Sequence, residues 1–458
     1  MGAGAILEPV IVVTLLFGGA WINRAPTVTS SGRASRWQFP VGQDFPGESE
    51  EVHDEEKSQS ACPKNRSLSP SLMLQESRWR QRQLHILGRT RIVQSPNTAV
   101  FKNRFLSRVL QKFPFLVEAW YWALIYWVSI AVYQLGRAFT ALTIQEGTVH
   151  VARKHALQVI ELEKRLHIFW EIPVQHFFMG YPVFMRYINW IYSFIHIPGT
   201  IAFLVGLYYY TITSNRLIES RFGRLEGSLQ GSPSGPWLYE ARRRTMAVCN
   251  LMAFIVFTLW PCMPPRLLSD ETVAGDIGTI ARSFGFTDTV HGADGAVSVW
   301  TANKFCNQWA AMPSLHFGYS LLVGITIMTT PLAPQHRRAR SVQIPFFNQS
   351  HPQLAPQVKL PPTRRLLCLF VGFLYPFTIL IAIVSTANHF ILDAVAGAMI
   401  CAIGWRVNGV LLNLLPFEDW FLWCLRIHKP TFEAFETAEL NTSDAGGEIA
   451  TAGVLYQQ

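Results

Sequence analysis

Two residues near the start of the last apolar run have types and a spacing that could do chemistry. His389 and Asp393 are four positions apart, so on a helix they would share one face. A carboxylate on one ring nitrogen fixes the imidazole tautomer and exposes the lone pair of the other nitrogen as a base or nucleophile. Because an aspartate in a membrane segment is costly, it usually has a partner and a role.

A second segment, from Ala310 to Gly318, opens another apolar run and contains Pro313, Ser314 and His316. Proline suits the first position of a helix, so the sequence predicts that a helix begins at Pro313. Ser314 and His316 then fall in the first turn, where free backbone N–H groups and the helix dipole can hold a phosphate or another oxyanion. An imidazole in that turn could touch the bound group.

A third segment, from Trp260 to Leu267, ends another apolar run with several prolines, which terminate the helix. Arg266 is the first cation after this turn, and a guanidinium can grip two phosphate oxygens at once. The three segments together supply the groups that an in-line phosphoryl transfer needs: a nucleophile, an orienting carboxylate, a proton donor and an oxyanion clamp.

Each segment also has a structural interpretation. His316 could be incidental to a capped membrane helix, and a buried pair of His389 and Asp393 could simply join two helices. Arg266 could extend its charged end toward water at a membrane interface. The convergence of three separate segments on one membrane face favours catalysis over these alternatives.

Composition places the chain among membrane proteins. Of its 458 residues, 50% are hydrophobic and only 15% are charged, and the mean hydropathy is +0.19. The formal charge of +9 does not indicate nucleic acid, because the lysines and arginines cluster beside apolar runs, as membrane orientation requires. We therefore expect the bilayer and membrane lipids as partners and no nucleic acid.

The apolar runs predict an all-α, polytopic membrane helix bundle with about six core spans. A shorter apolar segment from about Val10 to Ile22 predicts that residues 1–22 form an N-terminal signal anchor rather than a cleaved signal peptide, because a positive n-region is absent. Pro198 and Gly199 predict a kink in the second run. The core runs are approximately Leu116 to Leu142, Tyr187 to Tyr210, Met246 to Trp260, Pro313 to Pro331, Leu366 to Thr386 and Phe390 to Leu411.

The chain divides into four parts by composition. After the anchor, residues 23–112 are predicted to be a basic cytoplasmic region, disordered because its polar composition cannot offset the entropy of ordering. Residues 113–415 form the membrane catalytic domain, and residues 416–458 a cytoplasmic tail. Arginines after the second and fourth runs place both following loops in the cytoplasm, so His316 and His389 fall on the opposite face.

On that opposite face, the loop from Ile144 to Arg186 is predicted to hold an amphipathic helix at the membrane interface. His196, inside the second run, is interpreted as an interhelical hydrogen bonder. Cys262 and Cys306 flank one extramembrane loop, and a disulfide between them is a hypothesis.

Two motifs resemble a known family. The segments Pro313-Ser314-Leu315-His316 and His389-Phe390-Ile391-Leu392-Asp393 resemble the second and third signature motifs of the type 2 phosphatidic acid phosphatase superfamily. Within it, the chain looks most like the inositolphosphotransferase branch, which contains inositol phosphorylceramide synthase. Supporting phrases are Glu163-Lys164-Arg165-Leu166 with Phe169 and Glu171, Pro264-Pro265-Arg266, Gly285-Phe286-Thr287-Asp288-Thr289, and Asn307-Gln308-Trp309 before the second motif.

The chain also departs from the family pattern. Only Arg266 stands in for the cations of the first motif, and apolar Ala382 and Ile383 replace a Ser-Arg pair ahead of the third. The synthase tends to have a second histidine where this chain has Asn388. Fewer cations should therefore bind the phosphate than in the family pattern.

The resemblance implies a mechanism without metal or cofactor. His389 attacks phosphorus to form a phosphohistidine, Asp393 holds its other nitrogen, and His316 exchanges protons with the leaving and incoming oxygens. Arg266 and Ser314 hold the non-bridging oxygens. We expect a lipid phosphotransferase in the Golgi or another endomembrane, with its site on the lumenal face. The alternatives are a lipid phosphate phosphatase of the same superfamily and a non-catalytic membrane scaffold.

Overall fold

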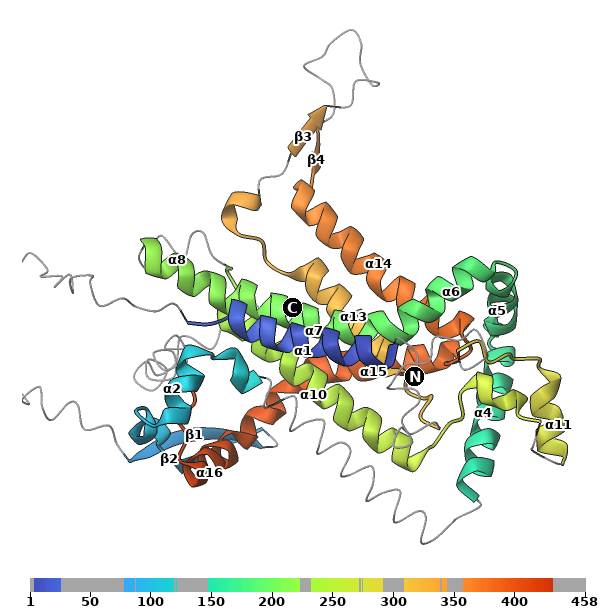
Figure 1. The fold of residues 1–458 in the computed structure, drawn as a ribbon, viewed down its shortest axis with the longest axis horizontal. Coiled ribbons are helices and arrows are strands. Elements are labelled where there is room, and N and C mark those ends of the chain that lie inside the picture. The colour runs from blue at the N-terminus through green and yellow to red at the C-terminus, as the bar shows by residue number, and fades with distance from the viewer. Residues whose placement is uncertain are drawn as a thin grey trace, which may run out of the picture.

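The computed structural model describes residues 4–25, 78–86, 88–118, 121, 147–222, 232–271, 273, 275–290, 309–337, 340–343 and 357–430. Within these ranges the chain is mostly helical, with two short antiparallel hairpins (Figure 1). The predicted class, a helical membrane protein, is confirmed. The finer prediction of six core spans is not.

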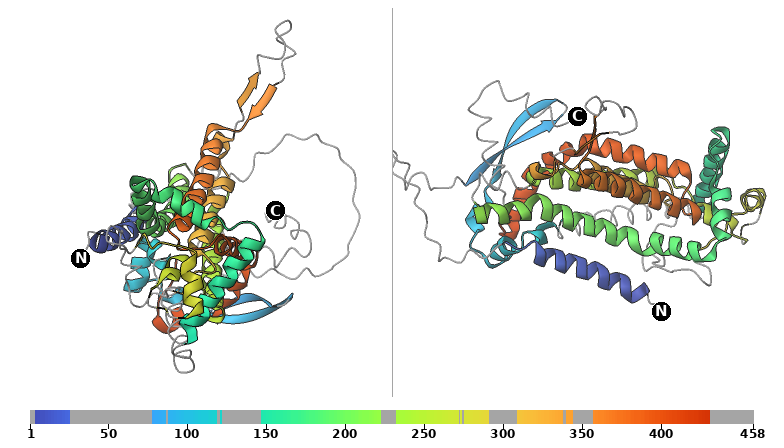
Figure 2. Two further views of the ribbon diagram at one scale, coloured as in Figure 1. Left: turned by 90° about the vertical axis from the view of Figure 1, so that its right-hand side faces the viewer. Right: turned by 90° about the horizontal axis from the view of Figure 1, so that it is seen from above.

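The long helices lie side by side in one bundle, as the right-hand view of Figure 2 shows. α13 packs against both α14 and α15, and α10 packs along α15. The outer face of α14 exposes a row of leucine and phenylalanine side chains, as expected of a lipid-facing surface. The bundle helices are α1 (Gly4–Ile22), α7 (His196–Tyr208), α10 (Gly235–Leu259), α13 (Leu315–Thr329), α14 (Thr363–Ser385) and α15 (Ile391–Val407).

Three helical segments of the described chain are long and apolar enough to cross a membrane: Pro182–Ile218, Thr363–Ser385 and Ile391–Leu425. Pro9–Ile22 and Leu315–Thr329 are shorter apolar helices. The third predicted run lies within α10, which extends toward the arginines that precede it. Most of the first predicted run lies outside the described residues.

The second predicted run lies in one unbroken helical segment, in which two π-helical turns separate the α-helical parts. These are η2 (Ile191–Ile195), between α6 (Pro182–Trp190) and α7, and η3 (Tyr209–Thr213), between α7 and α8 (Ser214–Phe222). Pro198 lies in the first turn of α7, directly after η2. A π turn shifts the register of the following helix, so the irregularity begins a few residues before the predicted kink.

One end of the bundle carries short helices that surround the candidate site. They are α4 (Gly147–Arg165), α5 (Glu171–Met179), η4 (Pro265–Ser269) and α11 (Asp276–Ser283), and Figure 1 shows α4, α5 and α11 beyond the end of the long helices. α4 corresponds to the predicted amphipathic helix. Its Ile160 is buried against protein, whereas Leu162, and Leu166 directly after the helix, are about half exposed. The apolar face is therefore only partly an interfacial surface.

The other end of the bundle holds a hairpin, β1 (Trp79–Ile86) with β2 (Arg89–Pro96), in which Trp79 pairs with Pro96. The prediction of disorder fails for this segment, because the hairpin packs on the C-terminal helical segment. The neighbouring elements are η1 (Thr98–Phe101), α2 (Phe105–Lys112), η7 (Asn408–Leu414) and α16 (Leu415–Leu425). A second hairpin, β3 (Arg340–Gln343) with β4 (Gln357–Leu360), follows the short turn η5 (Pro334–His336).

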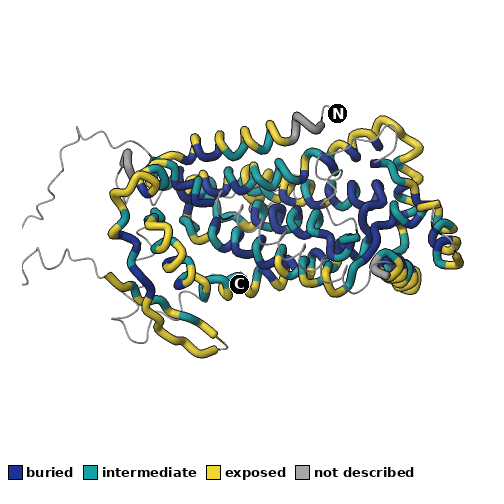
Figure 3. Tube along the Cα trace, turned by 60° about the horizontal axis from the view of Figure 1, so that its bottom comes forward, coloured by how far each residue is buried: buried dark blue, intermediate teal, exposed yellow. Residues whose placement is uncertain are grey.

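The buried residues of the described chain form two larger hydrophobic cores and a small one around Ile379 and Ile383, and the buried stretches lie toward the centre of the bundle in Figure 3. The larger core fills the bundle and includes Tyr208, Met246 and Leu322. The second core joins α4 to the ends of the bundle helices, with Ile160 and Phe390 among its members. This second core positions the short helices beside His389.

Candidate active site

His389 lies in the turn between α14 and α15, two residues before α15 begins. Its Nδ1 is 2.8 Å from the carbonyl oxygen of Ala311 and 3.4 Å from Oδ2 of Asp393. Both oxygens can only accept, so in the neutral ring Nδ1 carries the proton. The lone pair is therefore on Nε2, as a nucleophilic histidine requires.

Asp393 caps the helix whose first turn it occupies. Its Oδ2 accepts the backbone N–H of Phe390 at 2.9 Å while facing His389, and its side chain is fully buried. The predicted contact with His389 is present, although not because both residues lie on one helix. The capping turn holds them together instead.

His316 is the second residue of α13, and its ring faces His389. Its Nδ1 is 3.3 Å from Nε2 of His389, so Nδ1–H of His316 can donate to the lone pair there. The other faces of His316 meet Tyr192, whose ring is stacked at 5.0 Å between centroids, and His196 at 4.9 Å. The structure thus brings the two predicted histidines into direct contact.

Ser314 does not sit in the first turn of α13 but is its N-cap. Its fully buried hydroxyl accepts the N–H of Phe317 at 3.4 Å, and its own N–H donates to the carbonyl oxygen of Asp393 at 2.9 Å. The helix therefore begins two residues later than the proline predicted. Ser314 joins the two motifs through its backbone, and its role as a direct phosphate ligand stays a prediction.

Arg266 comes from η4 and is tied to the turn that carries His389. Its backbone N–H donates to the carbonyl oxygen of Ala387 at 2.8 Å, and its Nε donates to Oδ1 of Asn388 at 2.9 Å. Its Nη1 forms an ion pair with Asp288 at 3.0 Å. Arg266 is therefore beside the third motif, but a phosphate must share it with a carboxylate.

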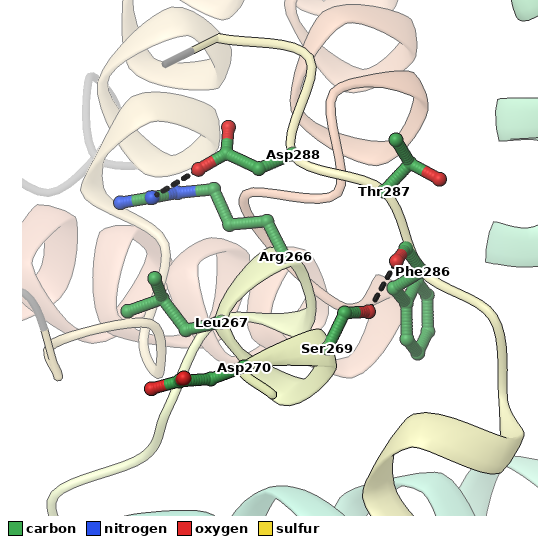
Figure 4. A pocket seen from close by; sticks show the side chains of 7 residues that line it. All are labelled: Arg266, Leu267, Ser269, Asp270, Phe286, Thr287 and Asp288. Atoms are coloured by element: carbon green, nitrogen blue, oxygen red, sulfur yellow. Dashed lines mark hydrogen bonds and ion pairs between the residues drawn. The ribbon is translucent and has the colours of Figure 1, made fainter. Parts of the chain in front are cut away.

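An open pocket of about 340 Å³ lies beside this arginine (Figure 4). In the figure Arg266 and Asp288 point toward each other across one side of it, and Ser269 donates to the carbonyl oxygen of Phe286 on the other side. The pocket presents both signs of charge together with hydroxyl groups. It is lined by Arg266, Leu267, Ser269, Asp270, Phe286, Thr287 and Asp288.

Two further carboxyl groups reach the first turn of α15 from other helices. Oε1 of Glu171 accepts the N–H of Ile391, and Oε1 of Glu163 accepts the N–H of Leu392, both at 2.8 Å. Burial raises the pKa of Glu163 to about 9, with the neighbouring Glu171 as the next cause. Burial also raises the pKa of Glu171.

Sequence reasoning missed part of this site. Glu163 and Glu171 entered only as supporting phrases of a resemblance, and Asn388 only as a departure from it. His196, interpreted as structural, packs on His316, and its Nδ1 is 3.5 Å from the hydroxyl of Tyr375. A signal for His196 existed, since an ionisable residue inside a membrane span is by default a candidate for function.

The remaining predictions about the site concern metal and sulfur. Among the described residues, no group of three or more His, Cys, Asp or Glu side chains could hold a metal ion. Cys262 is buried and has no disulfide partner among the described residues, and Cys306, with which a disulfide was hypothesised, lies outside them, so the disulfide stays a hypothesis.

The fold and the site define a helical membrane protein with two facing histidines, one of them held by a buried aspartate. The family model of the PAP2 superfamily matches residues 157–219, 234–343 and 358–407, which include His316, His389, Asp393 and Arg266. The chain belongs to the type 2 phosphatidic acid phosphatase (PAP2) superfamily and is a phosphatase or phosphotransferase of that superfamily. No curated protein and no solved structure matches the chain.

Proposed function

We propose that the chain is a lipid phosphotransferase resembling inositol phosphorylceramide synthase, and that it acts through a phosphohistidine at His389. The observation that carries this proposal is the 3.3 Å contact between Nε2 of His389 and Nδ1 of His316, with Nδ1 of His389 bound on its other side. One ring nitrogen is thus held and the other faces a second proton-carrying group. This is the arrangement that covalent catalysis with a general acid needs.

In the first half-reaction, Nε2 of His389 bonds to phosphorus as the bond from phosphorus to the lipid oxygen breaks. His316, doubly protonated, gives a proton to that leaving oxygen. Positive charge then develops on the ring of His389, and the carboxylate of Asp393 at 3.4 Å stabilises it.

In the second half-reaction, the hydroxyl of an acceptor lipid loses its proton to His316 and bonds to phosphorus. The bond from phosphorus to Nε2 breaks, and both histidines return to their starting states. Arg266 holds the non-bridging oxygens, since its ion pair with Asp288 can exchange for one with phosphate.

A lipid phosphate phosphatase is the second candidate, because membership of the PAP2 superfamily supports it equally. It shares the first half-reaction and differs only in that water attacks the phosphohistidine. Access of water or of a lipid hydroxyl to His389 therefore decides between the two activities.

We further propose that the site faces the lumen of the Golgi or another endomembrane. Arg242, Arg243 and Arg244 lie in the first half of α10. Arg242 lies over the ring of Trp405 and Arg244 donates to Asn408, at the end of α15 remote from His389, and a cytoplasmic position suits this end. Trypsin added to sealed microsomes should cleave the segment between α8 and α10. Cleavage there only after the membrane is opened would contradict this orientation.

The deciding experiment uses purified protein in detergent. One reaction contains phosphatidylinositol labelled in its headgroup together with ceramide, and another contains phosphatidic acid in water. Label on ceramide with release of diacylglycerol would support the transferase, and free phosphate without a lipid product would support the phosphatase.

Two variants make this assay specific. His389→Ala is the blank, because it removes the nucleophile, and His176→Ala is the matched control, because His176 is exposed on α5. We expect His176→Ala to keep full activity. Products that persist in His389→Ala would contradict the phosphohistidine, and an absence of product from both substrates would favour the scaffold interpretation.

A further inference from the structure

Three carboxyl groups converge on three consecutive backbone N–H groups at the start of α15. Asp393 accepts from Phe390, Glu171 accepts from Ile391 and Glu163 accepts from Leu392, at distances of 2.8–2.9 Å. One carboxyl belongs to α15 itself, one to the last turn of α4 and one to the first position of α5. Two other helices, α4 and α5, are therefore fixed to the first turn of α15.

The side chains that make these contacts are buried. Glu163, Glu171 and Asp393 are each 0% exposed, and in the described part of the chain neither glutamate forms an ion pair with lysine or arginine. The nearby Lys164 lies instead over the rings of Phe169 and Phe284. A helix N-terminus carries only about half a positive charge, so it cannot balance three buried anions.

The Oε2 atoms of the two glutamates indicate how the negative charge of this buried cluster can be reduced. Oε2 of Glu163 and Oε2 of Glu171 are both buried and have no hydrogen-bond donor among the described residues. Two carboxylates are acceptors only, whereas a carboxylic acid beside a carboxylate donates one hydrogen bond. The two carboxyl groups are hydrogen-bonding neighbours, so a single proton between them would satisfy both orphaned oxygens and remove one charge. Burial raises the pKa of both glutamates, and Glu171 raises that of Glu163 further, whereas the hydrogen bond with Glu163 lowers the pKa of Glu171; this agrees with one proton held by two interacting carboxyl groups.

We propose that Glu163 and Glu171 share one proton and act as one monoanionic clamp on the first turn of α15, which positions Asp393 and His389 for phosphoryl transfer. The claim that the clamp positions Asp393 and His389 for catalysis rests on the proposed function. The claim that the two glutamates share a proton does not depend on it. The clamp links the short helices α4 and α5 to the turn that carries the nucleophile. Neither glutamate touches the reacting atoms, so both are positioning residues.

The shared proton is tested by infrared spectroscopy of the purified protein, without any substrate. Wild-type protein near neutral pH should show the C=O stretch of a protonated carboxyl, shifted in D₂O. Glu163→Gln and Glu171→Gln should each lose this band, because the remaining glutamate then ionises beside a neutral amide that can donate to it. Glu161→Gln is the matched control, since Glu161 is exposed on the same helix and pairs with Arg165.

Three infrared results would overturn proton sharing. They are the absence of the band in wild-type protein, its loss in only one of the two glutamine variants, and its persistence in both. The first would mean that both glutamates are ionised, the second that one residue alone holds the proton, and the third that the proton is on another group.

The clamp is tested by comparing Glu163→Ala with Glu163→Gln. Alanine removes the acceptor for the N–H of Leu392, so hydrogen exchange of the amides from Phe390 to Asp393 should become faster, whereas glutamine keeps a carbonyl acceptor and should leave it nearly unchanged. Unchanged exchange in Glu163→Ala would overturn the clamp, whether or not the protein has the proposed activity.

The same pair of variants tests positioning through kinetics. In Glu163→Ala we expect kcat to fall about 100-fold with KM nearly unchanged, which is the scale of a misplacement of about 1 Å. Glu163→Gln should recover most of that kcat. Equal kcat in wild type and Glu163→Ala would overturn the positioning role, and an inactive wild type would reject the proposed function while the infrared and exchange results still decide the clamp.

Discussion

The neighbours of His389 determine its chemistry more than its own identity does. The carbonyl oxygen of Ala311 and the carboxylate of Asp393 lie 2.8 and 3.4 Å from Nδ1 of His389. Each of these two acceptors favours the tautomer that carries the proton on Nδ1. The carbonyl is the closer of the two and carries no charge. In the proposed mechanism Asp393 therefore serves charge stabilisation rather than the tautomer alone.

This distinction leads to a prediction for Asp393→Asn. The tautomer should survive, because Ala311 still accepts from Nδ1, but the charge that stabilises the phosphohistidine is lost. We expect kcat to fall about 100-fold, less than the roughly 10⁴-fold seen where the aspartate alone fixes the tautomer. Steady-state kinetics on the His389-dependent product would measure this, and a loss as complete as that of His389→Ala would contradict it.

The structure brings together residues that the sequence singled out, but the sequence did not predict all of their contacts. The spacing of His389 and Asp393 indicated a shared helical face, whereas the structure joins them through a helix cap. The proline predicted a helix start at position 313, and the helix begins after Ser314. Glu163 and Glu171 could not be assigned, because their partners are backbone groups more than 200 positions away.

At the scale of elements, the two histidines meet because α13 and α15 approach closely at Gly397. A Cβ added at Gly397 would come within 2.2 Å of the carbonyl oxygen of Ser314. Only glycine permits this contact between backbones. The separation of the two helices, and hence of His316 and His389, depends on a residue with no chemistry of its own.

We therefore predict that Gly397→Ala lowers both stability and kcat. Overpacking typically costs about 1–3 kcal/mol, and a shift of α13 would widen the histidine contact. Gly206→Ala on α7 is the matched control, since nothing lies within 4 Å of a Cβ there. The unfolding temperature and kcat should both fall in Gly397→Ala and not in Gly206→Ala. Equal values in the two variants would show that the contact between α13 and α15 does not require glycine at position 397.

The buried glutamates make the stability of α4 and α5 depend on pH. The pKa of Glu163 is about 9 in the folded chain, against an ordinary value of 4.5, because of burial and the neighbouring Glu171. Between these values the folded state holds a proton that the unfolded state has released, so stability should fall as pH rises. Asp393 faces the same turn and acts in the same direction on Glu163.

The measurement is the unfolding temperature across that pH window. We expect it to decline toward high pH in wild-type protein and in Glu161→Gln, and to change much less in Glu163→Gln, which has no proton to release. A rise in unfolding temperature toward high pH would contradict the assignment of the buried proton.

At the scale of the whole molecule, the bundle separates two assemblies. The site and its short helices lie at one end, and the β1–β2 hairpin packs on the C-terminal helical segment at the other (Figure 1). Apolar runs allowed the sequence to predict the long helices and their order. The hairpin was missed because its strands, rich in arginine and glutamine, have little apolar alternation, and because its main partner, Asp419, is far away in sequence.

Asp419 is where this distal assembly can be tested. Its carboxylate accepts from Arg82 at 2.8 Å and from the hydroxyl of Ser95 at 2.6 Å, so one α16 side chain binds both strands of the hairpin.

In Asp419→Ala the largely buried Arg82 loses this carboxylate, a change that costs on the order of 3 kcal/mol for a buried pair. We expect trypsin to cleave the hairpin at least tenfold faster in this variant, while the activity at the opposite end stays unchanged. Cys424→Ala, at an exposed position of the same helix, should change neither property. A loss of activity in Asp419→Ala without unfolding of the bundle would show that the two ends are coupled, because the described contacts of Asp419 reach only the hairpin.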